Sequence, residues 1–278
     1  MSSRFHKIIL SLVSLLAVSC TGDVLNVSEP KLVIDGFIED GGFPVVIVTN
    51  TIPVSRDFIG EDNIKDCVVR WAKVTVSDGE KEVILTGKAN KGYFPPYIYT
   101  TADLRGEAGK EYSLTVEYRG MKATALTTIP ESPVLKEINV VESSGPKSDY
   151  YLEASFDRGA GHASHCGFFV REEGSGTQYR PSYLGLVDDD ESDTWKVYPP
   201  ETDRWADFNP YFSSGMTIGV KLCTMDDTSY DYWRSFADNS TFSGNFIIYS
   251  DGNMKSNVVG GEGIWAGYGV DTRIVTIP

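Results

Sequence analysis

The sequence has few cysteines and histidines, and their scarcity excludes several classes of protein. It contains four cysteines and three histidines in 278 residues, and no C-x-x-C pair occurs. A zinc ribbon or a thioredoxin-type redox site needs such a pair, so neither is supported. One segment, GHASHC, brings His162, His165 and Cys166 together. Metal-binding histidines three residues apart converge on a helix, whereas this segment lies between strand signals and predicts a polar loop.

Motifs of catalysis and of cofactor binding are also missing. There is no G-x-S-x-G segment, and no nucleophile is placed beside His162 or His165. The glycine-rich GGEGIWAGYG does not have G-x-G-x-x-G spacing, and too few residues follow it to build a βαβ unit. The acidic run that begins at Asp188 lacks the alternating spacing of a calcium loop, which favours a solvated loop. We therefore expect no enzyme, no metal and no cofactor.

Positive charge is in short supply. Lysine and arginine total 25 against 39 aspartates and glutamates, which gives a formal net charge of −14. Nucleic-acid binding needs clustered basic residues, so a nucleic-acid partner is not expected. The same acidity opposes close contact with anionic lipid headgroups. We expect the folded part of the chain to stand off a membrane surface.

Long apolar runs are absent except at the N-terminus. Arg4 and Lys7 precede an apolar run, Ile8–Val18, that is too short for the roughly 20 residues of a spanning helix. This pattern predicts a secretory signal over residues 1–19. The residues before Cys20 resemble a lipobox, although Ala17 stands where leucine is usual. The sequence thus predicts lipidation of Cys20, with residues 20–30 as anchor and tether, and a protein that is held at a membrane without crossing it.

With Cys20 lipidated, three cysteines remain, so at most one disulfide can form. Cys166 and Cys223 share the second half of the chain and are the candidate pair. The alternative, which we favour slightly, is that Cys67, Cys166 and Cys223 are all buried free thiols, since a free cysteine behaves as a small apolar residue.

Alternation with a period of two dominates what remains, and it predicts an all-β, mostly antiparallel protein. In residues 31–130, SDGE marks the turn of one hairpin and Arg119-Gly120 marks the turn of another. Seven short strands in this range favour an immunoglobulin-like or transthyretin-like sandwich. Prolines 130 and 133 indicate a boundary.

Residues 134–278 then predict a second β-rich domain with one principal helix. The helix is expected over residues 228–239, with Thr228 or Ser229 as its cap and Trp233 buried. Strands are expected before it, and a final strand, RIVTI, after it.

Several blocks together resemble a known family. They are the lipobox, KLVIDGFIEDGGFPVVIVTNTIPV, GKEYSLTVEYRGMKATALTTIPESP, YDYWRSF and SNVVGGEGIWAGYGV. In this order they resemble the domain of unknown function 4249 family of Bacteroidota lipoproteins, and the resemblance covers nearly the whole chain after the signal. The most specific blocks are Gly109–Val116 and Ser256–Trp265. The resemblance implies an outer-membrane lipoprotein associated with a TonB-dependent receptor, and it supplies no catalytic residues.

One long segment, from Asp188 to Gly215, shows no clear period and is rich in aromatic residues. Such segments are often functional, and their rings suit a surface that contacts protein or sugar. The alternative is a loop whose rings cover the edge of a core. The candidate contact residues are Trp195, Tyr198, Arg204, Trp205, Phe208 and Tyr211.

The sequence therefore predicts a lipid-anchored outer-membrane protein, on the cell surface or facing the periplasm, that is a non-enzymatic accessory of a TonB-dependent nutrient-uptake receptor. The first alternative is a surface lipoprotein that binds carbohydrate or peptide by itself. A lower alternative is an adhesive, pilus-like subunit, for which no donor strand is apparent. The ligand, the receptor and the oligomeric state do not follow from the residues.

Overall fold

The structure is a computed structural model, and it describes residues 30–51, 67–144, 149–158, 165–188, 192–200, 209–240 and 254–278. The chain divides into two compact units, Met1–Pro30 and Lys31–Pro278, and every helix and strand named below belongs to the second. The expected signal segment, Cys20 and nearly all of the tether lie outside the described residues. Within the described ranges, no helix has the length and apolarity needed to cross a membrane.

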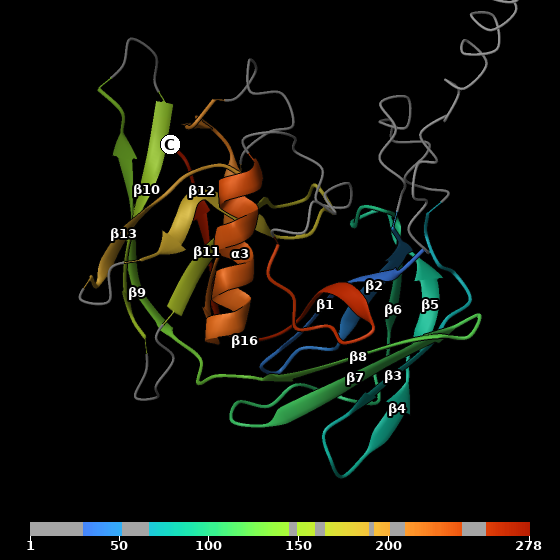
Figure 1. Ribbon diagram of the computed structural model, residues 1–278. Helices are drawn as coiled ribbons and strands as arrows, with labels where there is room; N and C mark the ends of the chain where they lie inside the picture. Colours follow the sequence, from blue (N-terminus) through green and yellow to red (C-terminus); the bar gives the residue numbers. More distant parts are fainter. Residues whose placement is uncertain are drawn as a thin grey trace, which may run out of the picture. The chain divides into compact units, whose positions relative to one another are not determined.

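An eight-stranded sheet, which we call the shared sheet, contains strands from both halves of the chain (Figure 1). Its order is β12-β11-β15-β16-β1-β2-β6-β5. All neighbours are antiparallel except β16 and β1, which run parallel. The strands are β1 (Leu32–Glu39), β2 (Val45–Asn50), β5 (Thr86–Ala89), β6 (Tyr97–Thr100), β11 (His165–Glu172), β12 (Arg180–Val187), β15 (Thr217–Met225) and β16 (Gly261–Thr276).

Two four-stranded sheets complete the β structure. The first has the order β4-β3-β7-β8, and in the second β10 pairs with β9, β13 and β14. Their strands are β3 (Lys73–Ser77), β4 (Glu82–Ile84), β7 (Glu111–Tyr118), β8 (Met121–Thr128), β9 (Val134–Glu142), β10 (Asp149–Asp157), β13 (Thr194–Val197) and β14 (Phe212–Ser213).

Side-chain alternation along β16 explains how the shared sheet packs against both smaller sheets. Trp265 enters the core between the shared sheet and the first small sheet, together with Ile34 and Leu114. Val275, an even number of residues further on, packs on the core of the second small sheet, where Leu152 and Val220 lie. Residues two apart face the same side of a strand, so both cores lie against one face of the shared sheet. The opposite face is left for the helix and for the site described below.

The first core contains a buried tyrosine of the kind found in immunoglobulin-like sandwiches. Tyr112 on β7 is fully buried, and its hydroxyl accepts a hydrogen bond from the Glu107 amide at 2.9 Å. The same hydroxyl donates to the Arg105 carbonyl at 3.3 Å. A tyrosine that bonds back to the backbone a few residues upstream is a tyrosine corner, which fixes the loop that enters the strand.

Glycines allow the close pairing of β16 with β1. Gly263 has a φ of +105°, and a Cβ there would collide with the Ile34 carbonyl oxygen. Gly36 on β1 leaves room for the Trp265 ring, because a Cβ there would lie 2.9 Å from Cε3 of that ring. The indole nitrogen of Trp265 then donates to the Tyr112 carbonyl at 3.0 Å. These contacts show that Gly36 and Gly263 serve close packing between β1 and β16.

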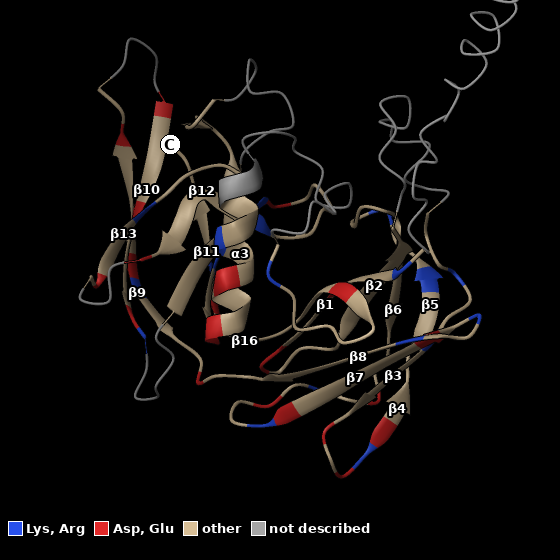
Figure 2. Cartoon of the chain, in the orientation of Figure 1, with Lys and Arg blue, Asp and Glu red and all other residues tan. Residues whose placement is uncertain are grey.

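The helix α3 (Asp227–Ser240) lies on the opposite face of the shared sheet, with an acidic residue in its first turn (Figure 2). It begins one residue before the predicted range. Its cap is Asp226, whose side-chain oxygen accepts a hydrogen bond from the Ser229 amide at 2.7 Å. The expected caps Thr228 and Ser229 are therefore wrong, because the first helical turn starts earlier. Trp233 is half-buried where full burial was expected.

The all-β, mostly antiparallel class is confirmed, and α3 is the single helix in the described part of the chain. Both predicted hairpins are present. Val76 pairs with Val83 across the SDGE turn, and Tyr118 pairs with Met121 across Arg119-Gly120. Arg119 and Gly120 have φ values of 47° and 83°, the left-handed conformations that a tight two-residue hairpin turn requires.

Three strand predictions need correction. The described part of residues 31–130 contains eight strands where seven were expected, since the chain breaks at Leu85 between β4 and β5. The segment from Asp188 to Gly215 includes β13 and β14, which were missed because a strand of two to four residues is too short to show a period. The final strand is the 16-residue β16 rather than the short RIVTI, because its glycines hid the pattern.

The expected boundary at prolines 130 and 133 lies between β8 and β9. However, β16 pairs with β1 through residues 261–268 and with β15 through residues 269–276. The second half of the chain thus supplies a strand to the sheet of the first half. Whether residues 31–130 and 134–278 fold as separate domains stays a prediction.

The structure answers the question of the cysteines. Among the described residues, Cys67, Cys166 and Cys223 form no disulfide; the last two are buried and Cys67 is half-buried. Cys166 on β11 faces the second core, whereas Cys223 on β15 faces the side of α3. A pairing of Cys166 with Cys223 is therefore wrong, because the two side chains lie on opposite faces of the shared sheet.

A candidate ligand-binding cleft

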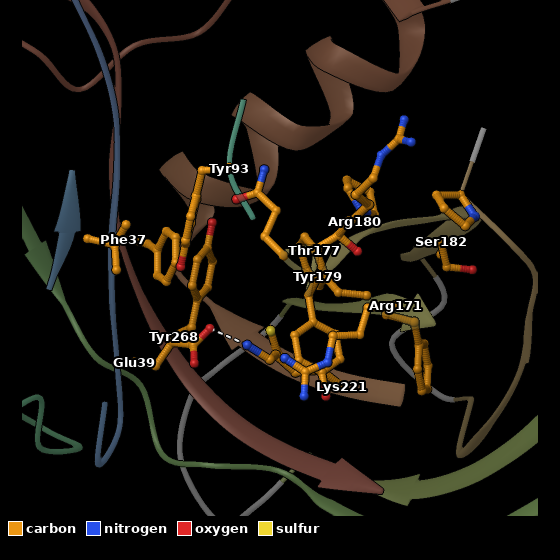
Figure 3. Close-up of a pocket in the computed structure, with 18 of the residues that line it drawn as sticks. Phe37, Glu39, Tyr93, Arg171, Thr177, Tyr179, Arg180, Ser182, Lys221 and Tyr268 are labelled. Atoms are coloured by element: carbon orange, nitrogen blue, oxygen red, sulfur yellow. Dashed lines mark hydrogen bonds and ion pairs between the residues drawn. The ribbon is translucent and has the colours of Figure 1, made fainter. Parts of the chain in front are cut away.

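A cleft of about 1740 Å³ opens on the face of the shared sheet that carries α3 (Figure 3). Strands β1, β11, β15 and β16 supply its floor, and its walls come from α3, from β12 with the loop before it, and from the loop after β5. Pockets for drug-sized ligands measure roughly 300–1,000 Å³. The cleft is therefore large enough for a ligand of several linked units.

Strand β1 supplies three of the floor side chains through simple alternation. Its even positions, such as Ile34 and Ile38, are buried in the first core. Its odd positions Asp35, Phe37 and Glu39 are partly exposed and line the cleft. A strand that the sequence shows as an apolar run thus presents two acids and a ring to one side.

Asp35 has an unusual environment for a carboxylate. It is partly buried, and no described residue forms a hydrogen bond or an ion pair with its side chain. Burial raises the pKa of Asp35 from 3.8 to about 6. A carboxylate without a partner in a partly dry site is unfavourable, so it points to a role other than stability.

The neighbouring acid, Glu39, is neutralised. Its carboxylate forms an ion pair with the Lys221 ammonium of β15 at 2.5 Å, and both side chains are largely buried. The Lys221 ammonium also lies 4.3 Å from the centre of the Tyr179 ring. Figure 3 shows the pair beside Tyr179. This contact ties the β1 side of the cleft to the β15 side.

A second cation is held in the same manner. The Arg171 guanidinium donates to the Glu173 carboxylate at 2.8 Å and lies 4.4 Å from the centre of the Tyr179 ring. Tyr179 thus contacts two cations, and each cation has its own acid. These two ion pairs are each close to neutral, and they fix the geometry of this part of the cleft.

Aromatic rings line the cleft beside these pairs. The rings of Phe37 and Tyr268 have centroids 6.3 Å apart, and Phe169 lies 6.2 Å from Tyr268. The Trp233 indole of α3 packs edge-on against Phe169 at 5.3 Å, and its nitrogen donates to the Tyr268 hydroxyl at 2.8 Å. These rings hold one another in place, so the apolar wall is formed before any ligand arrives.

Tyr93 lies on the facing wall, in the loop that follows β5. Burial raises the pKa of Tyr93 above its ordinary value, and the charges of Glu39 and Asp35 raise it further. This loop also touches the loop after β11, since the Gln178 amide donates to the Gly92 carbonyl at 2.9 Å. A Cβ on Gly92 would collide with the Gly176 carbonyl oxygen. A glycine is therefore required for the two walls to meet.

The structure describes three of the six predicted contact residues. Trp195 on β13 lines the cleft, packs partly on the second core, and donates to the Leu184 carbonyl at 2.9 Å. Tyr198 lies 6.4 Å from Tyr211, ring to ring, and 5.9 Å from Tyr151. Arg204, Trp205 and Phe208 lie outside the described residues, as does the lipidation site Cys20. The contact role of all six residues stays a prediction.

The GHASHC segment is divided by its own strand. His165 and Cys166 are the first residues of β11, so they face opposite sides of the sheet, and His162 lies outside the described residues. His165 stacks on Tyr230 at 4.0 Å and lies 3.3 Å from the Asp227 carboxylate. Among the described residues, no group of three or more histidine, cysteine or acidic side chains could hold a metal ion.

Sequence reasoning missed the floor of the cleft, which includes Asp35, Glu39, Arg171, Tyr179 and Lys221. One signal was available. Asp35 and Glu39 interrupt an otherwise apolar strand, and an acid at the centre of a buried strand calls for an explanation. The partners of these residues could not be found in this manner, because Glu39 and Lys221 are separated by 182 positions.

Comparison with protein families decides where the chain belongs. A family described as "Domain of unknown function (DUF4249)" matches residues 22–274. The chain belongs to the DUF4249 family. Among solved structures, a segment of two fibronectin type-III domains from chicken tenascin is 12% identical, with a TM-score of 0.26. The match covers 89% of this chain and 98% of the tenascin segment. Bovine butyrophilin, in its crystal structure, is 7% identical, with a TM-score of 0.20. That match covers 70% of this chain and 92% of the butyrophilin chain. No curated protein matches the sequence.

The two blocks that are most specific for the DUF4249 resemblance have structural tasks in this chain. Gly109–Val116 leads into β7 and supplies the tyrosine corner at Tyr112. In Ser256–Trp265, the Asn257 side chain accepts from the Trp265 amide at 2.9 Å and donates to the carbonyls of Trp265 and Leu126, at 2.8 and 3.1 Å. Both blocks stabilise the first core and the loops around it, whereas the cleft lies on the other face of the shared sheet.

Proposed function

We propose that this DUF4249 chain is a lipoprotein of the outer membrane, anchored through acylated Cys20, that serves a TonB-dependent nutrient-uptake receptor without catalysing a reaction. The cleft is the observation that carries this proposal. Aromatic rings and paired charges from several strands converge on a space larger than a small-molecule pocket. An accessory that presents nutrient to a receptor needs such a place to hold it.

The chemistry of the cleft supports binding over catalysis. Cys223 lines it, but burial raises the pKa of its thiol far above the ordinary value. The thiolate that a nucleophilic cysteine requires is then scarce at neutral pH. Glu39 and Glu173 are each occupied by a cation. These groups are arranged to shape and hold a ligand.

The same cleft also supports a second function, in which the protein captures carbohydrate or peptide without a receptor. Rings such as Phe37 and Trp233 offer flat apolar surfaces to a sugar or to a peptide side chain. The two functions differ in their partner rather than in their site. They are separated by what copurifies with the protein.

The test is a pull-down of the wild-type chain from native outer membrane, with the bound proteins identified by mass spectrometry. A stable complex with a large β-barrel receptor supports the accessory function. Binding to a glycan array or a peptide array by the isolated protein, with no receptor recovered, supports capture and contradicts the accessory function.

Anchoring is tested separately with Cys20→Ala, which is expected to move the protein out of the membrane fraction. The matched control is Cys67→Ala, because Cys67 is half-buried and forms no disulfide, and its loss is expected to leave the anchor intact. Wild-type protein recovered wholly in the soluble fraction, with no acyl mass on its N-terminal peptide, would contradict the anchored state.

A further inference from the structure

Asp35 is set apart from the other acids of the cleft. Five acidic residues line the cleft, and two of them, Glu39 and Glu173, hold cations in ion pairs. Glu172 and Asp188 are exposed. Asp35 alone is partly buried with no hydrogen bond or ion pair to its side chain among the described residues. The cleft therefore contains one carboxylate whose partner is not part of the described chain.

The basic residues of the cleft do not supply that partner. Lys221 and Arg171 are committed to Glu39 and Glu173. Lys88, Lys91, Arg180 and Arg234 are exposed and form no ion pair with Asp35. Cations line the same cleft, so a salt bridge could neutralise the Asp35 carboxylate as Lys221 neutralises that of Glu39. No described residue forms such a salt bridge with Asp35.

Rings surround the position that a partner would take. Phe37 is the next residue of β1 on the same face, and it packs beside Tyr268. Burial raises the pKa values of Tyr93 and Tyr268, and the charge of Asp35 adds to both shifts, which places these hydroxyls within its field. A carboxylate beside aromatic rings is the environment that suits an organic cation, because the ring faces and the acid both attract it.

We propose that the cleft binds a ligand carrying an amine or guanidinium group, which pairs with the Asp35 carboxylate while its apolar part lies against Phe37 and Tyr268. This inference rests on the proposed function only in treating the cleft as the place where ligand is held. The net charge of −14 favours the approach of cationic ligands. The cleft volume of about 1740 Å³ accommodates either a small amine or a short basic peptide.

The experiment is calorimetric titration of the full chain with matched probes. Phenethylamine is compared with 2-phenylethanol and 3-phenylpropionate, and the acetylated, amidated peptide Phe-Lys-Phe is compared with Phe-Gln-Phe. Within each set the aromatic part is kept, and one cationic group is replaced by a neutral or an anionic group. We expect the cationic member to bind about tenfold more tightly or better, as a charge-assisted hydrogen bond provides. Equal binding of a neutral or anionic member overturns the inference with wild-type protein alone.

Two variants locate the effect. Asp35→Asn keeps the shape of the side chain and is expected to remove the preference for the cation, and Asp35→Ser serves if the first variant does not fold. Glu153→Gln is the control, because Glu153 is an exposed acid on β10, outside the cleft. It loses one negative charge as well and is expected to keep the preference. A preference that persists in the Asp35 variants overturns the inference.

The sources of the cation are also separated. Tighter binding of the lysine peptide than of phenethylamine identifies a basic peptide, and equal binding identifies a small amine. Failure of this inference and failure of the proposed function are distinguishable. A receptor complex without amine binding removes only the ligand assignment, whereas amine binding without a receptor leaves capture as the function.

Discussion

The carboxylate of Glu39 meets the ammonium of Lys221 at 2.5 Å, although 182 positions separate them in the chain. One residue ends β1 and the other lies within β15, so the pair joins strands on either side of β16 in the shared sheet. Their side chains are 20% and 12% exposed, which limits screening by water. The pair holds the floor of the cleft at one spacing.

We predict that this pair is energetically coupled, in contrast to an exposed pair. A double-mutant cycle with Glu39→Gln and Lys221→Met is expected to give a coupling of about 1–3 kcal/mol, between the values for exposed and for fully buried pairs. The control is the Lys73–Glu117 pair, at 3.4 Å and about half exposed, for which about 0–1 kcal/mol is expected. Urea unfolding measures both. Equal couplings would contradict the claim that burial strengthens the pair.

Asp35 gives a prediction on pH. Its folded pKa is about 6 and its ordinary value is 3.8, so between these values the folded state keeps a proton that the unfolded chain releases. Stability therefore falls as pH rises through this window. Asp35→Asn lacks the effect, and it is expected to be more stable than wild type above the window by at most about 3 kcal/mol.

The measurement is thermal unfolding of wild type and Asp35→Asn at neutral pH and again at about pH 4. The advantage of the variant should shrink at the lower pH, where the wild-type carboxyl is protonated in the folded state and about half protonated in the unfolded chain. Glu153→Gln, on the exposed side of β10, should show no such change. A variant advantage that is the same at both pH values would rule out burial of Asp35 as its cause.

Trp233→Ala tests the aromatic wall. The ring is half-buried and donates to the Tyr268 hydroxyl, so its loss removes packing and leaves that hydroxyl without its donor. We expect about 2–4 kcal/mol of destabilisation, below the upper range for a fully buried tryptophan. Trp71→Ala is the control, since Trp71 is 86% exposed and should change stability by less than about 0.5 kcal/mol. Similar melting temperatures for the Trp233→Ala and Trp71→Ala variants would contradict the claim that the Trp233 ring holds the aromatic side of the cleft in place.

Two glycines separate backbone strain from collision. Gly79 has a φ of +87° with nothing within 4 Å of an added Cβ, whereas a Cβ on Gly263 would strike the Ile34 carbonyl. Gly79→Ala is expected to destabilise by about 1–2 kcal/mol through its backbone conformation alone. Gly263→Ala should lower stability by several-fold more or abolish folding. If the two variants unfold at the same urea concentration, β16 does not require this close approach.

Trp205, predicted from sequence as an anchor of the contact surface, has its own test. If it contacts a partner, Trp205→Ala weakens partner or glycan binding and leaves the melting temperature within about 2 °C, because a surface ring adds little to stability. If it packs on a core, the melting temperature falls instead. A destabilised variant that binds normally while folded would remove Trp205 from the contact surface.

Local pattern predicted much of this fold. Alternation identified the long strands of both halves, and Asp-Gly and Arg-Gly identified the two hairpins, because a strand period and a turn residue act over a few positions. Tyr230 and Trp233 identified α3 in the same manner. The parallel pairing of β1 with β16 was not predictable, since Leu32 and Gly261 lie 229 positions apart. The sequence of neither strand indicates which strand it pairs with.

The site was predictable only in fragments. The aromatic segment drew attention to Trp195, which does line the cleft. Asp35, the central acid of the site, was interpreted only as part of a strand. It becomes significant because no described residue pairs with its carboxylate. The absence of a partner is a property of the assembled sheet, and no single segment of sequence contains it.

The position of β16 has a consequence for synthesis. Strand β1 is among the first parts of the fold to emerge, yet its partner on one side is made only when residues 261–268 appear. Until then, the edge of β1 exposes unpaired amides and carbonyls that another chain could occupy. The nascent protein must therefore be shielded for almost its whole length, and a chain truncated before Gly261 would be prone to aggregate through that open edge.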